Sequence, residues 1–226
     1  MVAAFLLVIL LQAGPDAKAA VREKLLDNPL DPAIERALLD AIQAKPNSPE
    51  THYLYGQWAI LNHQESLAIR EETKAIALSG ENQVARMQAY TLIGIAEDSL
   101  DHESRALAAF QKARIANAKL ERPDAHTLNE YATFLLKRAK LKNAAQVIEE
   151  VLRIDPQLGS AHLTKAKLLE RSGRRPAALA EAELAAAHPS DVGEERAARA
   201  FLARGYFAEG DSEKAGFNQK WVEDHH

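Results

Sequence analysis

The amino-acid sequence predicts an all-α fold, a solenoid in which antiparallel helix pairs stack side by side. Small residues recur in pairs twelve positions apart, each pair within a helical pattern of apolar residues. Alanine is abundant while aromatic residues make up only 6% of the chain, which suits helices that pack closely. No segment shows the alternating pattern of a β-strand. One structural unit is therefore expected to be used several times.

The repeat has a nearly constant period. The small-residue pairs are Gly56 with Ala68, Gly94 with Ala106, Ala132 with Ala144, Ala166 with Ala178, and Ala203 with Ala215. Their first members lie 38, 38, 34 and 37 residues apart. We expect these residues and Phe110 to be the packing positions of the repeats, because larger side chains at a helix crossing would push the backbones apart.

Five helix pairs follow from this period. The expected ranges are 49–61 with 65–78, 83–99 with 103–118, 124–138 with 142–153, 159–171 with 175–187, and 193–207 with 212–222. Turn residues separate the helices of four pairs, whereas the third pair has only the weak turn signal Ala139-Lys140. Glycine or proline ends each of the first four pairs, as at Arg122-Pro123.

The N-terminal residues differ from the repeats. Residues 1–13 form an apolar run that ends near Ala13-Gly14, which is typical of an export signal, although no basic residues precede the run. The run is too short to span a bilayer. We expect an exported protein, periplasmic or secreted, that begins near Gly14; the alternative is a cytoplasmic protein with a buried N-terminal helix. Residues 14–48 indicate a degenerate capping helix pair ahead of the repeats in 49–226.

The repeats resemble the tetratricopeptide repeat, with about five copies over residues 49–222. The second repeat carries Tyr90, Ile93, Gly94, Ala106, Phe110 and Ala113 in register, and the third carries Leu128, Tyr131, Ala132, Leu135, Ala144, Ile148 and Pro156. The family tryptophan is absent; His52 and His162 stand at its position, which points to packing, and Glu72 replaces the family phenylalanine. The resemblance implies a right-handed superhelix whose first helices line a concave groove.

The same resemblance implies the residues of that groove. Its positions correspond to Tyr53, Gln57, Gln88, Thr91, Ile95, Asn129, Thr133, Lys137, Lys167, Arg171 and Arg204. We expect a scaffold or assembly factor of a bacterial envelope that holds a peptide or partner helix there. Lys and Arg outnumber Asp and Glu by 14 to 7 between Lys112 and Arg175, so the partner segment could be acidic. The alternative is an accessory subunit of an enzyme or polysaccharide-processing complex.

Several kinds of chemistry are not expected. The chain has no cysteine and no catalytic or phosphate-binding motif, so we predict no enzyme activity and no cofactor. Its eight histidines show no metal-ligand spacing, and a net charge of -4 with few aromatic residues argues against nucleic-acid binding. No later segment predicts a membrane span. Acidic pairs such as Glu71-Glu72 are expected on solvated helix faces.

Overall fold

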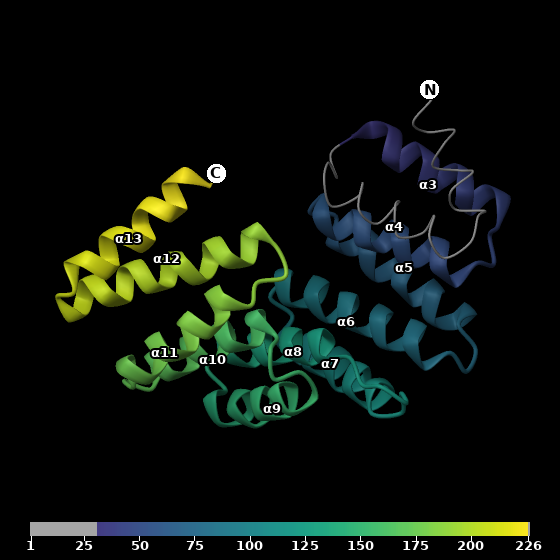
Figure 1. The fold of residues 1–226 in the computed structure, drawn as a ribbon. Helices are drawn as coiled ribbons and strands as arrows, with labels where there is room; N and C mark the ends of the chain where they lie inside the picture. The colour runs from purple at the N-terminus through teal and green to yellow at the C-terminus, as the bar shows by residue number, and fades with distance from the viewer. Residues whose placement is uncertain (1–30, 226) are drawn as a thin grey trace. The chain divides into compact units, whose positions relative to one another are not determined.

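The computed structural model describes residues 31–225, and every regular element in that range is an α-helix (Figure 1). The helices are α3 (Pro32–Ala44), α4 (Pro49–Leu61), α5 (Glu65–Leu78), α6 (Gln83–Ser99), α7 (Glu103–Asn117), α8 (Ala125–Lys137), α9 (Leu141–Ile154), α10 (Gly159–Arg171), α11 (Arg175–Ala187), α12 (Val192–Glu209) and α13 (Ser212–Asp224). The predicted all-α helical-repeat solenoid is confirmed.

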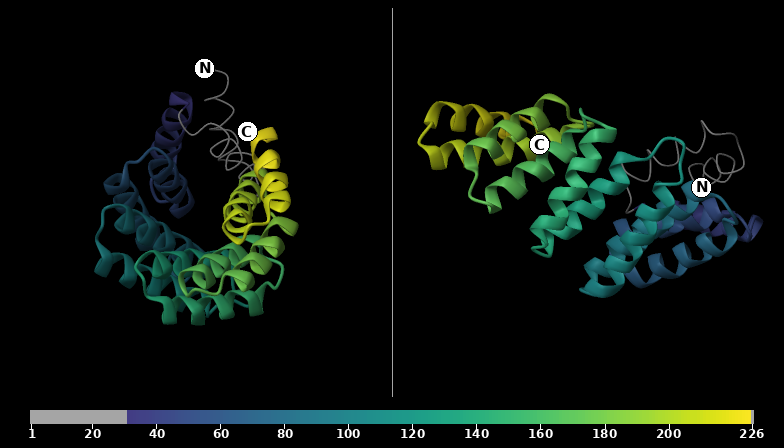
Figure 2. Two further views of the ribbon diagram at one scale, coloured as in Figure 1. Left: turned by 90° about the vertical axis from the view of Figure 1, so that its left-hand side faces the viewer. Right: turned by 90° about the horizontal axis from the view of Figure 1, so that it is seen from below.

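The chain divides into two compact units, Met1–Arg122 and Pro123–His226. In the described part of unit 1, α3 packs on α4, and the pairs α4/α5 and α6/α7 follow. Unit 2 contains the pairs α8/α9, α10/α11 and α12/α13. Figures 1 and 2 show each pair as an antiparallel hairpin, with α12 and α13 side by side along their length. The predicted export signal lies outside the described residues, and only α3 of the predicted capping pair lies within them.

Side-chain caps fix where several first helices of the pairs begin. Ser48 caps α4, Asn82 caps α6, Asp124 caps α8 and Asp191 caps α12, each accepting a hydrogen bond from a backbone N–H of the first turn. These N–H groups have no partner within the helix, so a side-chain oxygen here stabilises the helix start by about 1 kcal/mol.

The two helices of every pair are joined by the same turn. One residue in each turn has a left-handed backbone, namely His63, Asp101, Ala139, Gly173 and Gly210, with φ between 55° and 79°. The residue after it donates its N–H to a carbonyl in the last turn of the preceding helix, as in Lys140 N to Leu135 O at 2.9 Å. This is the Schellman arrangement, which satisfies helix-end carbonyls. The third pair, despite its weak turn sequence, folds like the others.

We expect Ala139→Gly to stabilise unit 2. Alanine at φ 57° is strained by its Cβ, whereas glycine adopts this region without that cost. The free energy of unfolding should rise by about 1 kcal/mol, measured by urea titration. Gly173→Ala, at the equivalent turn of the next pair, should lower it by a similar amount. Equal stability of both variants and the wild type would contradict the strain argument.

Small residues bring the two helices of each pair together. Ala68, Ala106, Ala132, Ala144, Ala166 and Ala178 are fully buried, and Ala203 and Ala215 are nearly so. A Cβ on Gly94 would lie 2.9 Å from the Phe110 ring, so α6 and α7 approach here as closely as glycine allows. A Cβ on Gly56 would lie 2.1 Å from Glu72 Oε1, because a carboxyl takes the place of the ring in the first pair.

Candidate functional site

A groove in unit 2 gathers polar side chains from the first helices of its three pairs. It is a hollow of about 410 Å³ lined by Asn129, Glu130 and Thr133 of α8, by Gly159, Ser160, Leu163, Thr164 and Lys167 of α10, and by Asp191, Gly193, Glu194 and Ala197 at and after the start of α12. The side chains project from three neighbouring helices into one space, so a bound segment could contact all three pairs.

Two polar atoms at the groove are buried without a partner. Asn129 is 5% exposed, and its Oδ1 accepts no hydrogen bond from a described residue; Ser160 Oγ likewise has no partner among them. Thr164, by contrast, is satisfied, because its Oγ1 donates to the Ser160 carbonyl at 2.9 Å. A buried polar atom without a partner costs about 1–3 kcal/mol, so Asn129 and Ser160 are positioned to hydrogen-bond a bound molecule.

The groove is lined by three acidic residues, Glu130, Asp191 and Glu194, and by one basic residue, Lys167. Desolvation raises the pKa of Glu130, and the nearby negative charge of Glu194 adds to the increase, although His126 opposes it. Desolvation also lowers the pKa of Lys167, helped by the positive charge of Arg204. Two carboxyl groups therefore lie close together near the start of α12, while two cations lie close together further along the first helices.

Only some of the basic groove residues predicted from the sequence line this groove. Lys167 lines the hollow, whereas the Arg171 guanidinium donates to the carbonyl of Leu136 near the end of α8. Lys137, at the last position of α8, is exposed and has an electrostatic or polar contact of its own. Arg204 lies on α12 and lines a different hollow, between α12 and α13. Of the four predicted basic residues, Lys167 is therefore the one that lines this groove.

Unit 1 carries the remaining predicted groove residues on α4 and α6. Tyr53, Gln57, Gln88 and Ile95 are half-buried, and Gln57 Oε1 has no hydrogen-bond partner. Thr91 is 8% exposed and donates to the Met87 carbonyl, so its hydroxyl is occupied within α6. No described helix between residues 31 and 225 is long and apolar enough to cross a membrane.

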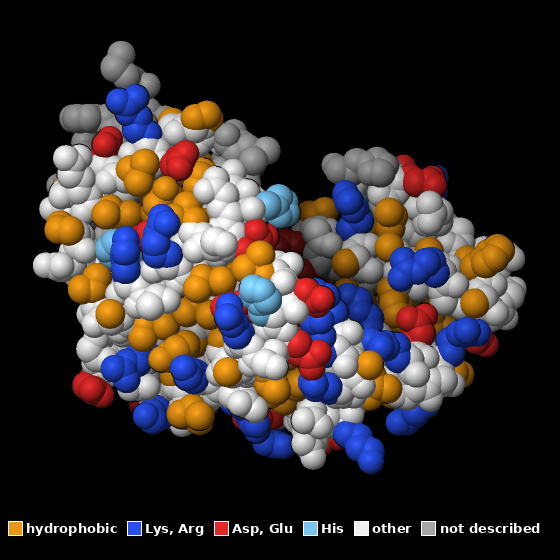
Figure 3. All heavy atoms as spheres, turned by 180° about the vertical axis from the view of Figure 1, so that it is seen from behind, with side chains coloured by type: hydrophobic (Ala, Val, Ile, Leu, Met, Phe, Trp, Pro, Cys, Tyr) orange, Lys and Arg blue, Asp and Glu red, His pale blue; other side chains and the backbone are white. Residues whose placement is uncertain are grey.

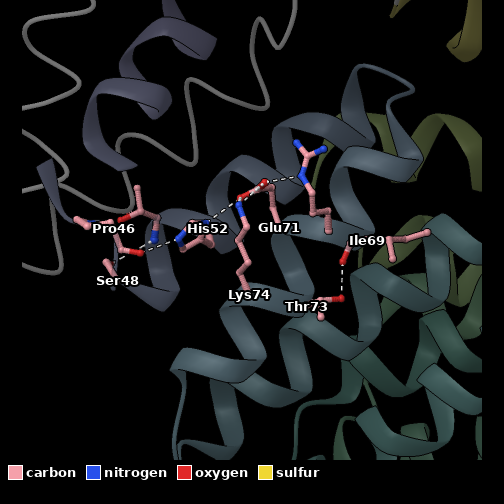
Figure 4. A network of polar contacts seen from close by, with 9 residues as sticks. Pro46, Ser48, His52, Ile69, Glu71, Thr73 and Lys74 are labelled. Atoms are coloured by element: carbon pink, nitrogen blue, oxygen red, sulfur yellow. Dashed lines mark hydrogen bonds and ion pairs between the residues drawn. The ribbon is translucent and has the colours of Figure 1, made fainter. Parts of the chain in front are cut away.

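A histidine joins the two helices of the first pair. Figure 4 shows the His52 ring between Pro46 and Glu71, with Nδ1 2.8 Å from Glu71 Oε2 and Nε2 2.9 Å from the Pro46 carbonyl. Lys74 also donates to the Glu71 carboxylate, at 3.1 Å. The ring therefore links the Glu71 carboxylate of α5 to the Pro46 carbonyl, which precedes α4.

The fourth pair repeats this arrangement. His162 Nδ1 lies 2.7 Å from Glu181 Oε2, its Nε2 lies 3.0 Å from the Pro156 carbonyl, and Lys165 contacts the same carboxylate. Burial alone would raise the pKa of Glu181, but the hydrogen bonds from Lys165 and His162 outweigh it and lower the pKa below its usual value. The pKa of Glu71 is lowered in the same way, by His52, Lys74 and Arg70 against its burial.

The expected solvated face at Glu71-Glu72 is wrong. Glu71 is 2% exposed because it faces His52 across the helix pair, and Glu72 is fully buried over Gly56. Neither carboxyl oxygen of Glu72 has a hydrogen-bond partner. Burial raises the pKa of Glu72 well above its usual value, and the charge of Glu71 raises it further.

The helix pairs of this chain are shared by solved structures of other proteins. A scan of family models and a search of curated proteins found no match. The chain is similar to PilF of Pseudomonas aeruginosa, with a TM-score of 0.68 and 17% identity over 92% of this chain and 90% of that one. It is also similar to YrrB, a TPR protein with an unusual peptide-binding site, with a TM-score of 0.53 and 17% identity over 85% and 93% of the two chains. The chain has a tetratricopeptide-like fold.

A third structural neighbour aligns with even more of the chain. PilW, a widely conserved type IV pilus biogenesis factor, has a TM-score of 0.68 and 12% identity over 94% of each chain. At these identities the likeness concerns the fold. It supports the sequence resemblance, whose repeats occupy the observed helix pairs α4/α5 to α12/α13.

The histidine and glutamate pairs were missed in the sequence, although a signal was present. Each histidine stands at the position of the tetratricopeptide tryptophan, and a glutamate follows nineteen residues later in both repeats. The fifth repeat has Arg199 and Asn218 at the same two positions, 3.4 Å apart, whereas the second and third have the apolar or aromatic pairs Tyr90 with Ala109 and Leu128 with Val147. Polar residues therefore replace apolar residues at both positions together.

Proposed function

We propose that this protein is a binding scaffold whose unit 2 groove holds an extended peptide segment of another protein. The observation that carries the proposal is Asn129, which lines the groove and whose buried Oδ1 has no hydrogen-bond partner among residues 31–225. An extended peptide has a free backbone N–H at every residue except proline, and such an N–H would supply the missing hydrogen bond. The tetratricopeptide-like fold, and the peptide-binding site named for the neighbour YrrB, support this reading.

The charges of the groove orient the peptide. An acidic residue would lie near Lys167, and a basic residue near Glu130 and Glu194. Basic, acidic and hydrophobic side chains are interspersed over the face drawn in Figure 3. Selectivity for an acidic segment would depend on Lys167, the basic residue of the groove lining.

The test is selection of peptides from a displayed random library on the full chain. Selected peptides should contain Asp or Glu, and Asn129→Ala should weaken their binding about tenfold, which corresponds to one hydrogen bond of about 1.4 kcal/mol. Lys167→Gln should weaken binding at low salt and make it less sensitive to salt. Fluorescence anisotropy measures both effects.

Lys142→Gln is the matched control for Lys167→Gln. Lys142 is exposed on α9, a second helix of its pair and outside the groove lining, so its loss should leave peptide affinity unchanged. Selected peptides that bind the Asn129→Ala and Lys167→Gln variants as tightly as the wild type would refute the groove as the binding site.

A polysaccharide-binding role gains no support from the two tryptophans. Trp58 is 4% exposed and stacks on Tyr55, and Trp221 stacks on His225.

We include export in the proposal because the apolar run at residues 1–13 predicts it, and because a type IV pilus biogenesis factor is among the structural neighbours. The proposed protein holds partners and carries out no reaction of its own.

A further inference from the structure

The outer face of the last helix pair contains a second hollow, separate from the peptide groove. It measures about 480 Å³ and is lined by Ala203, Arg204 and Phe207 of α12 and by Ser212, Ala215, Gly216 and Gln219 of α13. Phe207 is 76% exposed, although it is a large aromatic side chain. Exposed apolar surface of this kind often marks an interaction site.

This face is the counterpart of a surface that is buried one repeat earlier. Moving back by the 37-residue period places its residues at Ala166, Lys167, Glu170, Arg175, Ala178, Leu179 and Ala182. Four of these, Ala166, Ala178, Leu179 and Ala182, form one hydrophobic cluster with Ala198, Phe201 and Leu202 of α12. In the fourth pair, this surface is therefore covered by α12, the first helix of the fifth pair. In the fifth pair, no described helix covers the equivalent surface, which forms the hollow.

The covered face of the fourth pair and the open face of the fifth differ at one residue, which determines the size of the side chain that a docked helix can place there. On the covered face, the Leu179 side chain fills the space beside Gly205 of α12, where an added Cβ would lie 2.5 Å from Leu179 Cδ2. On the hollow face, Gly216 takes the place of Leu179, and nothing lies within 4 Å of a Cβ added to it. A helix that docks here needs a large apolar side chain where α12 has glycine.

We propose that the α12/α13 face binds an amphipathic helix of a partner protein, packed as a further first helix of the stack. Its bulky apolar residue would enter the hollow at Gly216, its apolar stripe would cover Phe207, and an acidic residue would face Arg204, which forms no ion pair with another described residue. The stacking interface between α11 and α12 continues into this face, which is why the occupant is a helix.

Within residues 31–225, no helix of this chain offers a free apolar stripe that could cover this face. The large hydrophobic side chains exposed in residues 31–225 are Leu39, Val84, Leu100, Ile115, Ile154, Leu184, Val192, Phe207 and Phe217. They are scattered among the helices, without the spacing of three and four residues that forms a stripe. A second copy of this chain therefore lacks a suitable helix among its described residues.

A helix exchange tests the proposal without knowledge of the partner. The probe is a fluorescent peptide with the sequence of α12, stapled on its solvent side so that it stays helical, in two forms: the native sequence and Gly205→Leu. The wild-type protein should bind the Gly205→Leu peptide at least tenfold more tightly than the native peptide. The protein variant Gly216→Leu should reverse this preference, since it restores the large side chain of the covered face.

Phe207→Ala should weaken binding of the Gly205→Leu peptide. The control is Phe217→Ala, which removes an exposed ring of α13 outside the hollow and should leave the binding unchanged. Circular dichroism should show all variants folded, because the altered side chains are exposed or open to space. Equal affinity for both peptides, or binding that Gly216→Leu leaves unchanged, would overturn the proposal. A wild-type dimer in sedimentation that Gly216→Leu abolishes would assign the face to a second copy and also overturn it.

Discussion

Glu72→Gln is expected to stabilise unit 1 at neutral pH, by an amount that increases with pH. The Glu72 carboxyl is fully buried over Gly56 and has no hydrogen-bond partner. Burial disfavours its ionised form and raises its pKa well above the usual 4.5, and the negative charge of Glu71 raises it further. Glutamine has the same shape and never ionises.

The direction of the pH effect follows from proton binding. Because the pKa of Glu72 is higher in the folded than in the unfolded state, its favourable contribution is complete below about pH 4.5 and is lost as the pH rises through the folded pKa. Wild type and Glu72→Gln should therefore have similar stabilities in acid. Above that pH their difference should grow, by at most about 1.4 kcal/mol per pH unit, until the folded pKa is reached.

Glu71→Gln is the matched control and should act in the opposite direction. The pKa of Glu71 is lowered in the folded state, so its contribution is present above about pH 4.5 and is lost as the pH falls through the folded pKa. Its replacement should destabilise the protein at neutral pH, with less effect in acid. Urea titrations read by Trp58 fluorescence, in a Trp221→Phe background, report on unit 1. A pH-independent effect of Glu72→Gln would refute buried ionisation as the cause.

The sequence predicted the fold far better than it predicted the burial of Glu71 and Glu72. Helix limits such as 65–78 and 175–187 coincide with α5 and α11, because apolar periodicity and turn residues mark them locally. Burial of Glu72 depends instead on which residue faces it across the pair, here Gly56. Sequence alone predicts that a charged residue is exposed to solvent, because its neighbours in space are not known. The interpretation of Glu71-Glu72 was wrong for this reason.

The groove shows the same division. Repeat positions alone place Asn129, Thr133 and Lys167 on first helices, and all three line the unit 2 groove. They do not reveal that Arg171 donates to the Leu136 carbonyl, nor that the start of α12 brings Glu194 near Glu130. Those contacts depend on the conformations of long side chains between the helices and on the path of the loop before α12. The repeat period predicts neither.

Gly94→Leu is expected to destabilise unit 1 by about 1–3 kcal/mol through overpacking. Gly94 lies on α6 against the Phe110 ring of α7, which is 2% exposed, and even an added Cβ would lie 2.9 Å from two ring carbons. The ring has little room to move, because it is surrounded by packed side chains. The free energy of unfolding from urea titration measures the loss.

A second substitution separates this cause from a general effect on the helix. Phe110→Ala alone should destabilise by about 3–5 kcal/mol through the cavity it leaves. In combination with Gly94→Leu, however, the leucine can occupy that cavity, so the double variant should be more stable than the sum of the two losses predicts. Strict additivity would mean that Gly94 and Phe110 do not contact each other. It would place the crossing of α6 and α7 elsewhere, and the period that relates Gly94 to Gly56 would then no longer account for the close approach in either pair.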